Sequence, residues 1–152
     1  MYGGMIMKIA ICSDHRGYEL KTELVKKMLD KNIQCEDFGC FNTDRCDYPK
    51  FAFKVGEAVR DNKCDFGVVI CGSGDGVSIA ANKVKGIRCV CVKDISHVER
   101  ARQHVNVNVL AFAAEETTAS EAMAMVEKMI STDFLGDRYE ERLEMIEEYE
   151  QK

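Results

Sequence analysis

The 152-residue sequence lacks several features that would point to a large or extended partner. Its 21 Lys and Arg residues are outnumbered by 26 Asp and Glu residues, so no basic surplus is available to neutralise a nucleic-acid backbone. No apolar run approaches the roughly 18–20 residues of a membrane-spanning helix. The first seven residues lack the basic region and long apolar stretch of a signal peptide. We therefore expect a cytoplasmic enzyme or binding protein with no nucleic-acid or membrane partner.

The eight cysteines include no C-x-x-C pair. Structural zinc sites usually need such close pairs together with nearby histidines, so the spacing does not favour a metal site. A chain of this length can also bury its own core without disulfides. Most of the cysteines lie in apolar, strand-like runs and are interpreted as small buried hydrophobic residues. Cys71 is the exception because of its position.

Short apolar runs alternate with amphipathic segments along the chain. The expected strands cover 8–13, 34–38, 66–71, 87–92 and 108–112, and the expected helices cover 17–31, 49–60, 77–83, 96–104, 118–130 and 138–152. In 17–31, lysines alternate with the apolar residues, as in an amphipathic helix. Two other helices begin with the spacing of a capping box, Ser96 to Glu99 and Thr118 to Glu121.

This alternation, without hairpin signals, predicts one domain, 1–152, in which a parallel sheet is covered by helices on both faces. Such sheets bind ligands at the carboxyl ends of their strands. The residues that follow the strands are therefore the candidates for a site. They include Asp14 and His15 after the first strand and the loop 71–76 after the third.

The loop contains three alternating glycines, Gly72, Gly74 and Gly76, between a strand and a helix. It is not the dinucleotide fingerprint, because the third glycine of G-x-G-x-x-G would fall on Val77, and it is not a Walker loop, because no G-K-[ST] follows. Its N–H groups, aimed at a helix start, form a natural anion cradle. The alternative is a tight turn without a ligand.

Cys71 ends the strand immediately before this loop. The positive end of a helix favours a thiolate over a thiol, so this cysteine could act as a base or nucleophile. In that case its sulfur should lie at the mouth of an amide-lined pocket. A buried structural cysteine is the alternative.

Two histidines and two arginines complete the candidate residues. His104 closes a predicted helix, whose negative end favours a protonated imidazole, whereas His15 follows a strand. Either could equally be a surface or hydrogen-bonded residue. Arg138 and Arg142 are four residues apart on one helix face, where they could clamp a phosphate together. Alternatively, Arg138 could pair with Glu141.

Taken in order and spacing, these segments resemble the ribose-5-phosphate isomerase B family, in the group that includes galactose-6-phosphate isomerase subunits and allose-6-phosphate isomerase. The resemblance extends from Lys8 to about Ile146. It rests on 13–17 (SDHRG), 47–49 (DYP), 70–76 (ICGSGDG), 79–83 (IAANK), 102–104 (RQH) and 108–110 (NVL), with Arg138 and Arg142.

The resemblance implies a five-stranded parallel sheet in three α/β/α layers and an aldose–ketose isomerisation that uses neither metal nor cofactor. Ribose 5-phosphate and ribulose 5-phosphate would interconvert through an enediolate. Cys71 would be the base that moves a proton between C1 and C2. Ser73 and the backbone N–H groups of the glycine loop (Gly72, Gly74, Asp75 and Gly76) would stabilise the enediolate oxygen. Such a reaction needs one base and donors for the developing negative oxygen.

The resemblance also assigns the remaining residues. His104 would open the sugar ring with help from Asp14. The phosphate would be held by His15, Arg138 and Arg142, and Tyr48 would line the pocket.

Family members form dimers or tetramers whose active sites are shared between two subunits, so a homodimer or homotetramer is expected here. The last helix carries an apolar stripe that suits such a contact, formed by Tyr139, Leu143, Ile146 and Tyr149.

Three positions depart from the family pattern: Val105, Asp75 and Glu115. They leave open a six-carbon aldose phosphate or an unphosphorylated sugar as the substrate. A non-catalytic sugar-phosphate-binding protein is a third alternative, which the presence of Cys71 and His104 disfavours.

Overall fold

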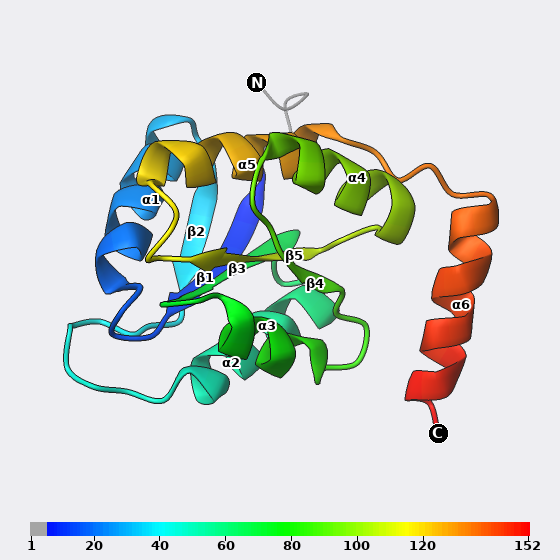
Figure 1. Cartoon of the computed structure of the whole chain (residues 1–152), viewed down its shortest axis with the longest axis horizontal. Coiled ribbons are helices and arrows are strands. Elements are labelled where there is room, and N and C mark those ends of the chain that lie inside the picture. The colour runs from blue at the N-terminus through cyan, green and yellow to red at the C-terminus, as the bar shows by residue number, and fades with distance from the viewer. Residues whose placement is uncertain (1–5) are drawn as a thin grey trace.

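The computed structural model describes residues 6–152 and has a five-stranded sheet at its centre (Figure 1). The strands lie in the order β2-β1-β3-β5-β4, and every neighbouring pair is parallel. Their bounds are β1 Lys8–Ser13, β2 Gln34–Asp37, β3 Phe66–Cys71, β4 Cys89–Cys91 and β5 Val109–Ala113. The predicted parallel sheet is thereby confirmed.

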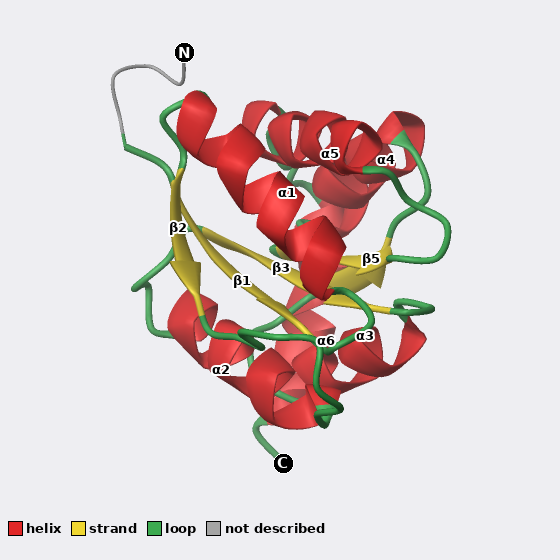
Figure 2. Cartoon of the chain, turned by 90° about the vertical axis from the view of Figure 1, so that its left-hand side faces the viewer, coloured by secondary structure: helices red, strands yellow, loops and turns green. Residues whose placement is uncertain are grey.

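Helices cover both faces of the sheet, which gives the three predicted layers (Figure 2). The helices α1, α4 and α5 pack on one face, and α2 and α3 pack on the other. Their bounds are α1 Tyr18–Asp30, α2 Tyr48–Arg60, α3 Asp75–Asn82, α4 Ile95–Val105 and α5 Ala119–Ser131. No helix within residues 6–152 is both long enough and apolar enough to cross a membrane.

The strands β3 and β5 are apolar throughout because both of their faces are buried. In β3, Val68 and Ile70 pack toward α1, α4 and α5, whereas Val69 and Cys71 pack toward α2 and α3. This alternation is the two-residue period of a strand. It directs the Cys71 side chain to the face that carries α3, the helix that begins four residues later.

The capping box predicted at Ser96 is wrong. Asp94 caps α4 instead, since its extended backbone lets Oδ1 accept the His97 N–H at 2.8 Å. Asp94 precedes Ser96 in the chain, and its carboxylate accepts a backbone N–H that the first turn of the helix leaves without a partner. The capping box of α5 is confirmed, with Thr118 and Glu121 accepting each other's backbone N–H groups.

The last helix, α6 (Arg138–Glu150), lies beyond the β4 side of the sheet (Figure 1). It is joined to the body near both ends, because the Leu135 N–H donates to the Gln103 carbonyl and the Gly86 N–H donates to Glu150 Oε2. Within its predicted apolar stripe, Leu143 is buried, but Ile146 and Tyr149 are 54% and 74% exposed. Much of the stripe is therefore uncovered in a single chain.

Candidate active site

The carboxyl end of the sheet brings together residues from the two central strands. Ser13, the last residue of β1, pairs with Ile70 of β3. The next residue, Asp14, donates its N–H to the Ile70 carbonyl at 3.1 Å. The β1–α1 turn and the glycine loop after Cys71 consequently start side by side.

The Cys71 sulfur is hydrogen-bonded to the backbone of the glycine loop. It accepts the Gly74 N–H at an N···S distance of 3.2 Å. Gly74 is the N-cap of α3 with a φ of 79°, which favours glycine. A Cβ at this position would also lie 2.6 Å from the Cys91 sulfur and 3.1 Å from the Ala113 nitrogen. Only glycine therefore fits the turn that points this amide at the sulfur.

The sulfur is less open than its place before the glycine loop predicts, because Cys71 is only 5% exposed. The alternating pleat places its side chain in the apolar cluster under α2 and α3, and the Gly74 amide turns inward to meet it. A substrate carbon would have to reach this sulfur through the small exposed fraction that the loop leaves.

Six of the seven other thiols have a raised pKa, and burial is the main cause in each. Burial raises the pKa of Cys35 and Cys89 to about 12 and that of Cys12 well above its usual range. It also raises the pKa of Cys46 and Cys64 to about 11 and raises that of Cys91. These six side chains stay protonated near neutrality and do not compete as bases. In the described part of the chain, no three His, Cys, Asp or Glu side chains gather as metal ligands.

The rest of the loop borders a pocket of about 250 Å³. The Asp75 N–H donates to Ser73 Oγ at 3.2 Å, and both side chains are exposed. The Tyr48 ring covers Gly76, where a Cβ would lie 2.5 Å from the ring carbon Cζ. The pocket is lined by Ser73, Asp75, Cys91, Val92, Lys93, Ala113, Glu116 and Thr117.

Asp14 and His15 have different partners in the β1–α1 turn. The buried Asp14 carboxylate uses Oδ1 to accept the N–H groups of Arg16 and Gly17, at 2.9 and 3.0 Å. His15 is half-buried, and its Nδ1 accepts the Cys46 N–H at 3.3 Å. Both side chains are thus held by backbone donors next to the glycine loop.

An ion pair between Arg16 and Glu115 crosses Gly72. Glu115 is one of the departures from the family pattern, and no sequence motif indicates its partner. A Cβ on Gly72 would lie 2.9 Å from Glu115 Oε1 and 3.1 Å from Arg16 Cζ. Both side chains are more than half exposed, so the pair adds little stability, but it covers the backbone directly after Cys71.

A second group of predicted residues lies around Tyr139 of α6. The His104 ring stacks on the Tyr139 ring with a centroid distance of 4.6 Å and an interplanar angle of 17°. The guanidinium carbons of Arg138 and Arg142 lie 5.0 and 6.0 Å from the same ring centroid. Arg138 also donates to Tyr139 Oη at 3.1 Å. The sequence pattern places Tyr139 in the apolar stripe and does not indicate its role as a platform, although it is adjacent to Arg138.

These two groups lie at opposite ends of the sheet. Helix α4 begins after the carboxyl end of β4 and ends, at Val105, before the amino end of β5. In β5, Val109 pairs with Gly67, whereas Ala113 pairs with Cys71. A strand of five residues spans roughly 13 Å. One chain therefore places His104, Arg138 and Arg142 at the amino end and the other predicted site residues at the carboxyl end.

A parallel α/β/α sheet with a thiol, a carboxylate and a glycine loop at its carboxyl end belongs to the class of α/β proteins that bind small molecules at the strand ends. Comparison with known proteins identifies the family. The sequence pattern of the Ribose/Galactose Isomerase family matches residues 9–146, and the chain belongs to this family.

Individual relatives match over nearly their whole length. Ribose-5-P isomerase B of Listeria innocua is 38% identical over 146 residues, which are 96% of this chain and 99% of the relative. The structure of ribose-5-phosphate isomerase B from Clostridium thermocellum superposes with a TM-score of 0.92 at 39% identity, covering 95% of this chain and 98% of that one. The enzyme from Mycoplasma genitalium, with bound ribulose 5-phosphate, gives a TM-score of 0.90 at 37% identity, covering 97% and 99%.

Proposed function

We propose that the chain is a ribose-5-phosphate isomerase, which interconverts ribose 5-phosphate and ribulose 5-phosphate through an enediolate. The observation that carries the proposal is the Gly74 N–H bond to the Cys71 sulfur at the carboxyl end of β3, in a chain of the Ribose/Galactose Isomerase family. A backbone donor at a helix start stabilises negative charge on sulfur. The relative with bound ribulose 5-phosphate supports a sugar phosphate as the substrate.

In this proposal, the Cys71 thiolate takes the proton from C2 of the aldose, which gives the enediolate, and returns it to C1. The hydroxyl proton of O2 passes to O1 in the same reaction, which gives the ketose. The negative oxygen that develops is stabilised by Ser73 and by the N–H groups of the glycine loop at Gly72 and Gly76. The Asp75 N–H, which donates to Ser73 Oγ, orients that hydroxyl. Donors placed where charge develops lower the barrier most effectively in a site that excludes water. The deep position of Cys71 supports such exclusion.

His104 acts as the acid–base group that opens the sugar ring, assisted by the Asp14 carboxylate. The phosphate is bound by His15, Arg138 and Arg142, and Tyr48 lines the pocket. The Tyr139 ring supports this assignment, since it gathers His104 and both arginines on one surface. Neither a metal nor a cofactor is required.

We further propose that each active site is shared between two chains of a homodimer or homotetramer. The support is topological, because Cys71 and His104 lie at opposite ends of the sheet in one chain. A two-fold assembly can bring the carboxyl end of one sheet to the amino end of another. The exposed Ile146 and Tyr149 side chains of α6 would be covered in that contact.

The proposal takes residues 1–152 as a single isomerase domain that works in the cytoplasm. All eight cysteines are free thiols, which is the usual state in a reducing compartment.

Replacing Cys71 by Ala tests the proposed base. General-base catalysis contributes about 10²- to 10⁴-fold, so we expect kcat for ribose 5-phosphate to fall by about 10³-fold. Cys35→Ala is the matched control, since Cys35 is a half-buried thiol of the outer strand β2, and it should retain wild-type turnover. The measurement is formation of ribulose 5-phosphate by each purified variant.

Three results would change the assignment. Turnover that survives in Cys71→Ala removes the thiol from the mechanism. Faster turnover of allose 6-phosphate or of an unphosphorylated pentose by the wild type favours one of the alternative substrates. Binding of sugar phosphates without turnover of any of them favours the non-catalytic protein.

A further inference from the structure

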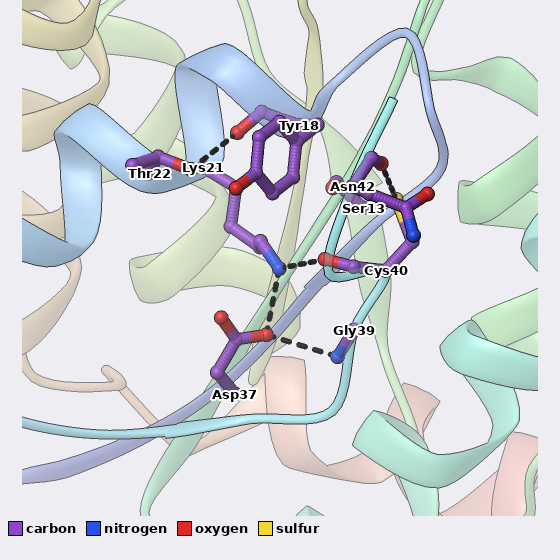
Figure 3. A network of polar contacts seen from close by, with 8 residues as sticks. All are labelled: Ser13, Tyr18, Lys21, Thr22, Asp37, Gly39, Cys40 and Asn42. Atoms are coloured by element: carbon purple, nitrogen blue, oxygen red, sulfur yellow. Dashed lines mark hydrogen bonds and ion pairs between the residues drawn. The ribbon is translucent and has the colours of Figure 1, made fainter. Parts of the chain in front are cut away.

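Helix α1 carries a buried ammonium group that the proposed mechanism does not use. Lys21 is only 1% exposed and belongs to the largest fully buried side chains. Its Nζ donates to Asp37 Oδ1 at 2.8 Å and to the Cys40 carbonyl (Figure 3). The rings of Tyr18 and Phe41 lie 5.5 and 5.1 Å from the same nitrogen. Burying a charge is costly unless it is paired. Here both acceptors, Asp37 and Cys40, belong to the segment 37–40 at the end of β2.

The segment 37–40 extends the pairing of β2 with β1 to Ser13, the last residue of β1. Asp37 Oδ1 accepts the Gly39 N–H at 2.9 Å (Figure 3). The Gly39 carbonyl accepts the Ser13 N–H, and the Cys40 N–H donates to the Ser13 carbonyl, both at 2.8 Å. The Lys21 ammonium therefore fixes the backbone directly beside the residue that precedes Asp14 and His15.

The same segment continues to the His15 ring. Six residues after Cys40, the Cys46 N–H donates to His15 Nδ1 at 3.3 Å. Since Nδ1 accepts this bond, the neutral imidazole carries its proton on Nε2, on the other side of the ring. An Nε2–H group is the donor that a phosphate oxygen needs.

The ion pair itself contributes little to stability, because burying the Lys21 ammonium is costly while the Asp37 side chain is 33% exposed. What the ammonium adds is a fixed geometry, since it donates at once to the Asp37 side chain and to the Cys40 carbonyl of the segment 37–40.

We propose that Lys21 is a positioning residue for phosphate binding: with Asp37 it holds the 39–46 segment so that the Cys46 amide keeps His15 in its Nε2–H form. Lys21 does not touch the substrate. The inference rests on the proposed function of His15 as a phosphate ligand, and its signature is a change in KM with little change in kcat, because phosphate binding is used equally by the substrate and the transition state.

The test removes both charges while preserving shape, in the double variant Lys21→Met and Asp37→Asn. The amide oxygen of the substituted side chain can still accept the Gly39 N–H, but the bond from Lys21 to the Cys40 carbonyl is lost. We expect KM for ribose 5-phosphate to rise about tenfold with kcat within about threefold of the wild type. Leu24→Ala, on the same buried face of α1, is the control for lost stability, and it should leave KM unchanged.

A second readout does not depend on activity. The chain has only three histidines, so ¹⁵N NMR at a pH of about 8, where free imidazole is neutral, can report the His15 tautomer after assignment with His15→Asn. We expect the Nε2–H form in the wild type and a mixture of tautomers in the double variant. If that variant does not fold, Asp37→Asn alone should show the same two effects to a smaller degree.

The outcomes separate this inference from the proposed function. A folded double variant with an unchanged tautomer and an unchanged KM overturns the role of Lys21 and leaves the isomerase assignment standing. Absence of isomerase activity in the wild type overturns the proposed function, whereas the tautomer measurement still decides whether Lys21 sets the state of His15. An equal rise of KM in Leu24→Ala reduces Lys21 to a structural residue.

Discussion

At the scale of single residues, the surroundings of each thiol decide what its sulfur can do. Cys89 lies at the start of β4 in the apolar cluster, and burial raises its pKa from 9.0 to about 12. Burial raises the pKa of Cys35, on β2, to about 12 as well. The Cys71 sulfur instead meets the amide at the start of α3. The same side chain thus serves as a packing group at Cys35 and Cys89 and is bonded by a backbone amide at Cys71, the proposed base.

The raised pKa of Cys89 predicts a pH dependence of stability. In the unfolded chain this thiol ionises above about pH 9, whereas in the folded chain it stays protonated until about pH 12. Its contribution is therefore complete below pH 9 and is lost as the pH rises toward 12. Between pH 9 and 11 the loss should be about 2 kcal/mol.

Urea unfolding in the presence of a reductant checks this prediction. The free energy of unfolding of Cys89→Ala should decline less steeply between pH 9 and 11 than that of the wild type. Parallel declines in the two proteins would show that Cys89 ionises alike in the folded and unfolded chains.

At the scale of elements, the start of α3 depends on a glycine in the left-handed region. Both Gly74 and Gly86 have positive φ, 79° and 84°. A Cβ on Gly74 would collide with Cys91 and approach the β5 backbone, whereas a Cβ on Gly86 would meet nothing within 4 Å. The two positions therefore separate backbone strain from steric collision.

Gly74→Ala should lower the free energy of unfolding by about 3 kcal/mol, because strain and collision add, and Gly86→Ala by about 1 kcal/mol from strain alone. Gly74→Ala should also lose most isomerase activity, since its amide would turn away from the Cys71 sulfur. Chemical denaturation and the isomerase assay measure both effects. Equal losses of stability in the two variants would contradict the packing described for this turn.

The elements could largely be predicted from the sequence because their apolar periods are strong. Where prediction failed, two local signals competed. Ser96 has the correct spacing to Glu99, but Asp94 precedes it and takes the His97 amide. Lys21 lies among lysines that alternate with apolar residues, a pattern typical of a solvated position. Its ammonium is nevertheless buried, and its hydrogen-bond partners, Asp37 and Cys40, are more than 15 residues away in the sequence. Such long-range partners leave no periodic signal.

At the scale of the whole molecule, the candidate site could be listed from the sequence but not assembled. Cys71 ends β3 and Asp14 follows β1, so both could be placed at the carboxyl end of the sheet; the strand order, which the sequence did not indicate, brings them side by side. The stacking of His104 on Tyr139 joins α4 to α6, and no sequence motif indicates that these two helices meet. The separation of Cys71 from His104 follows from the direction of α4 relative to β5, and it makes the second chain part of the proposed chemistry.

Mixing two inactive variants tests this central claim most directly. Cys71→Ala and His104→Ala should each have very low activity alone, but a mixed dimer contains one site with both residues intact. After the subunits are exchanged in equal amounts, the account predicts recovery of about a quarter of wild-type activity, the value for random pairing in a two-fold dimer. A mixture that exchanges subunits and yet stays as inactive as its components would contradict an active site shared between chains.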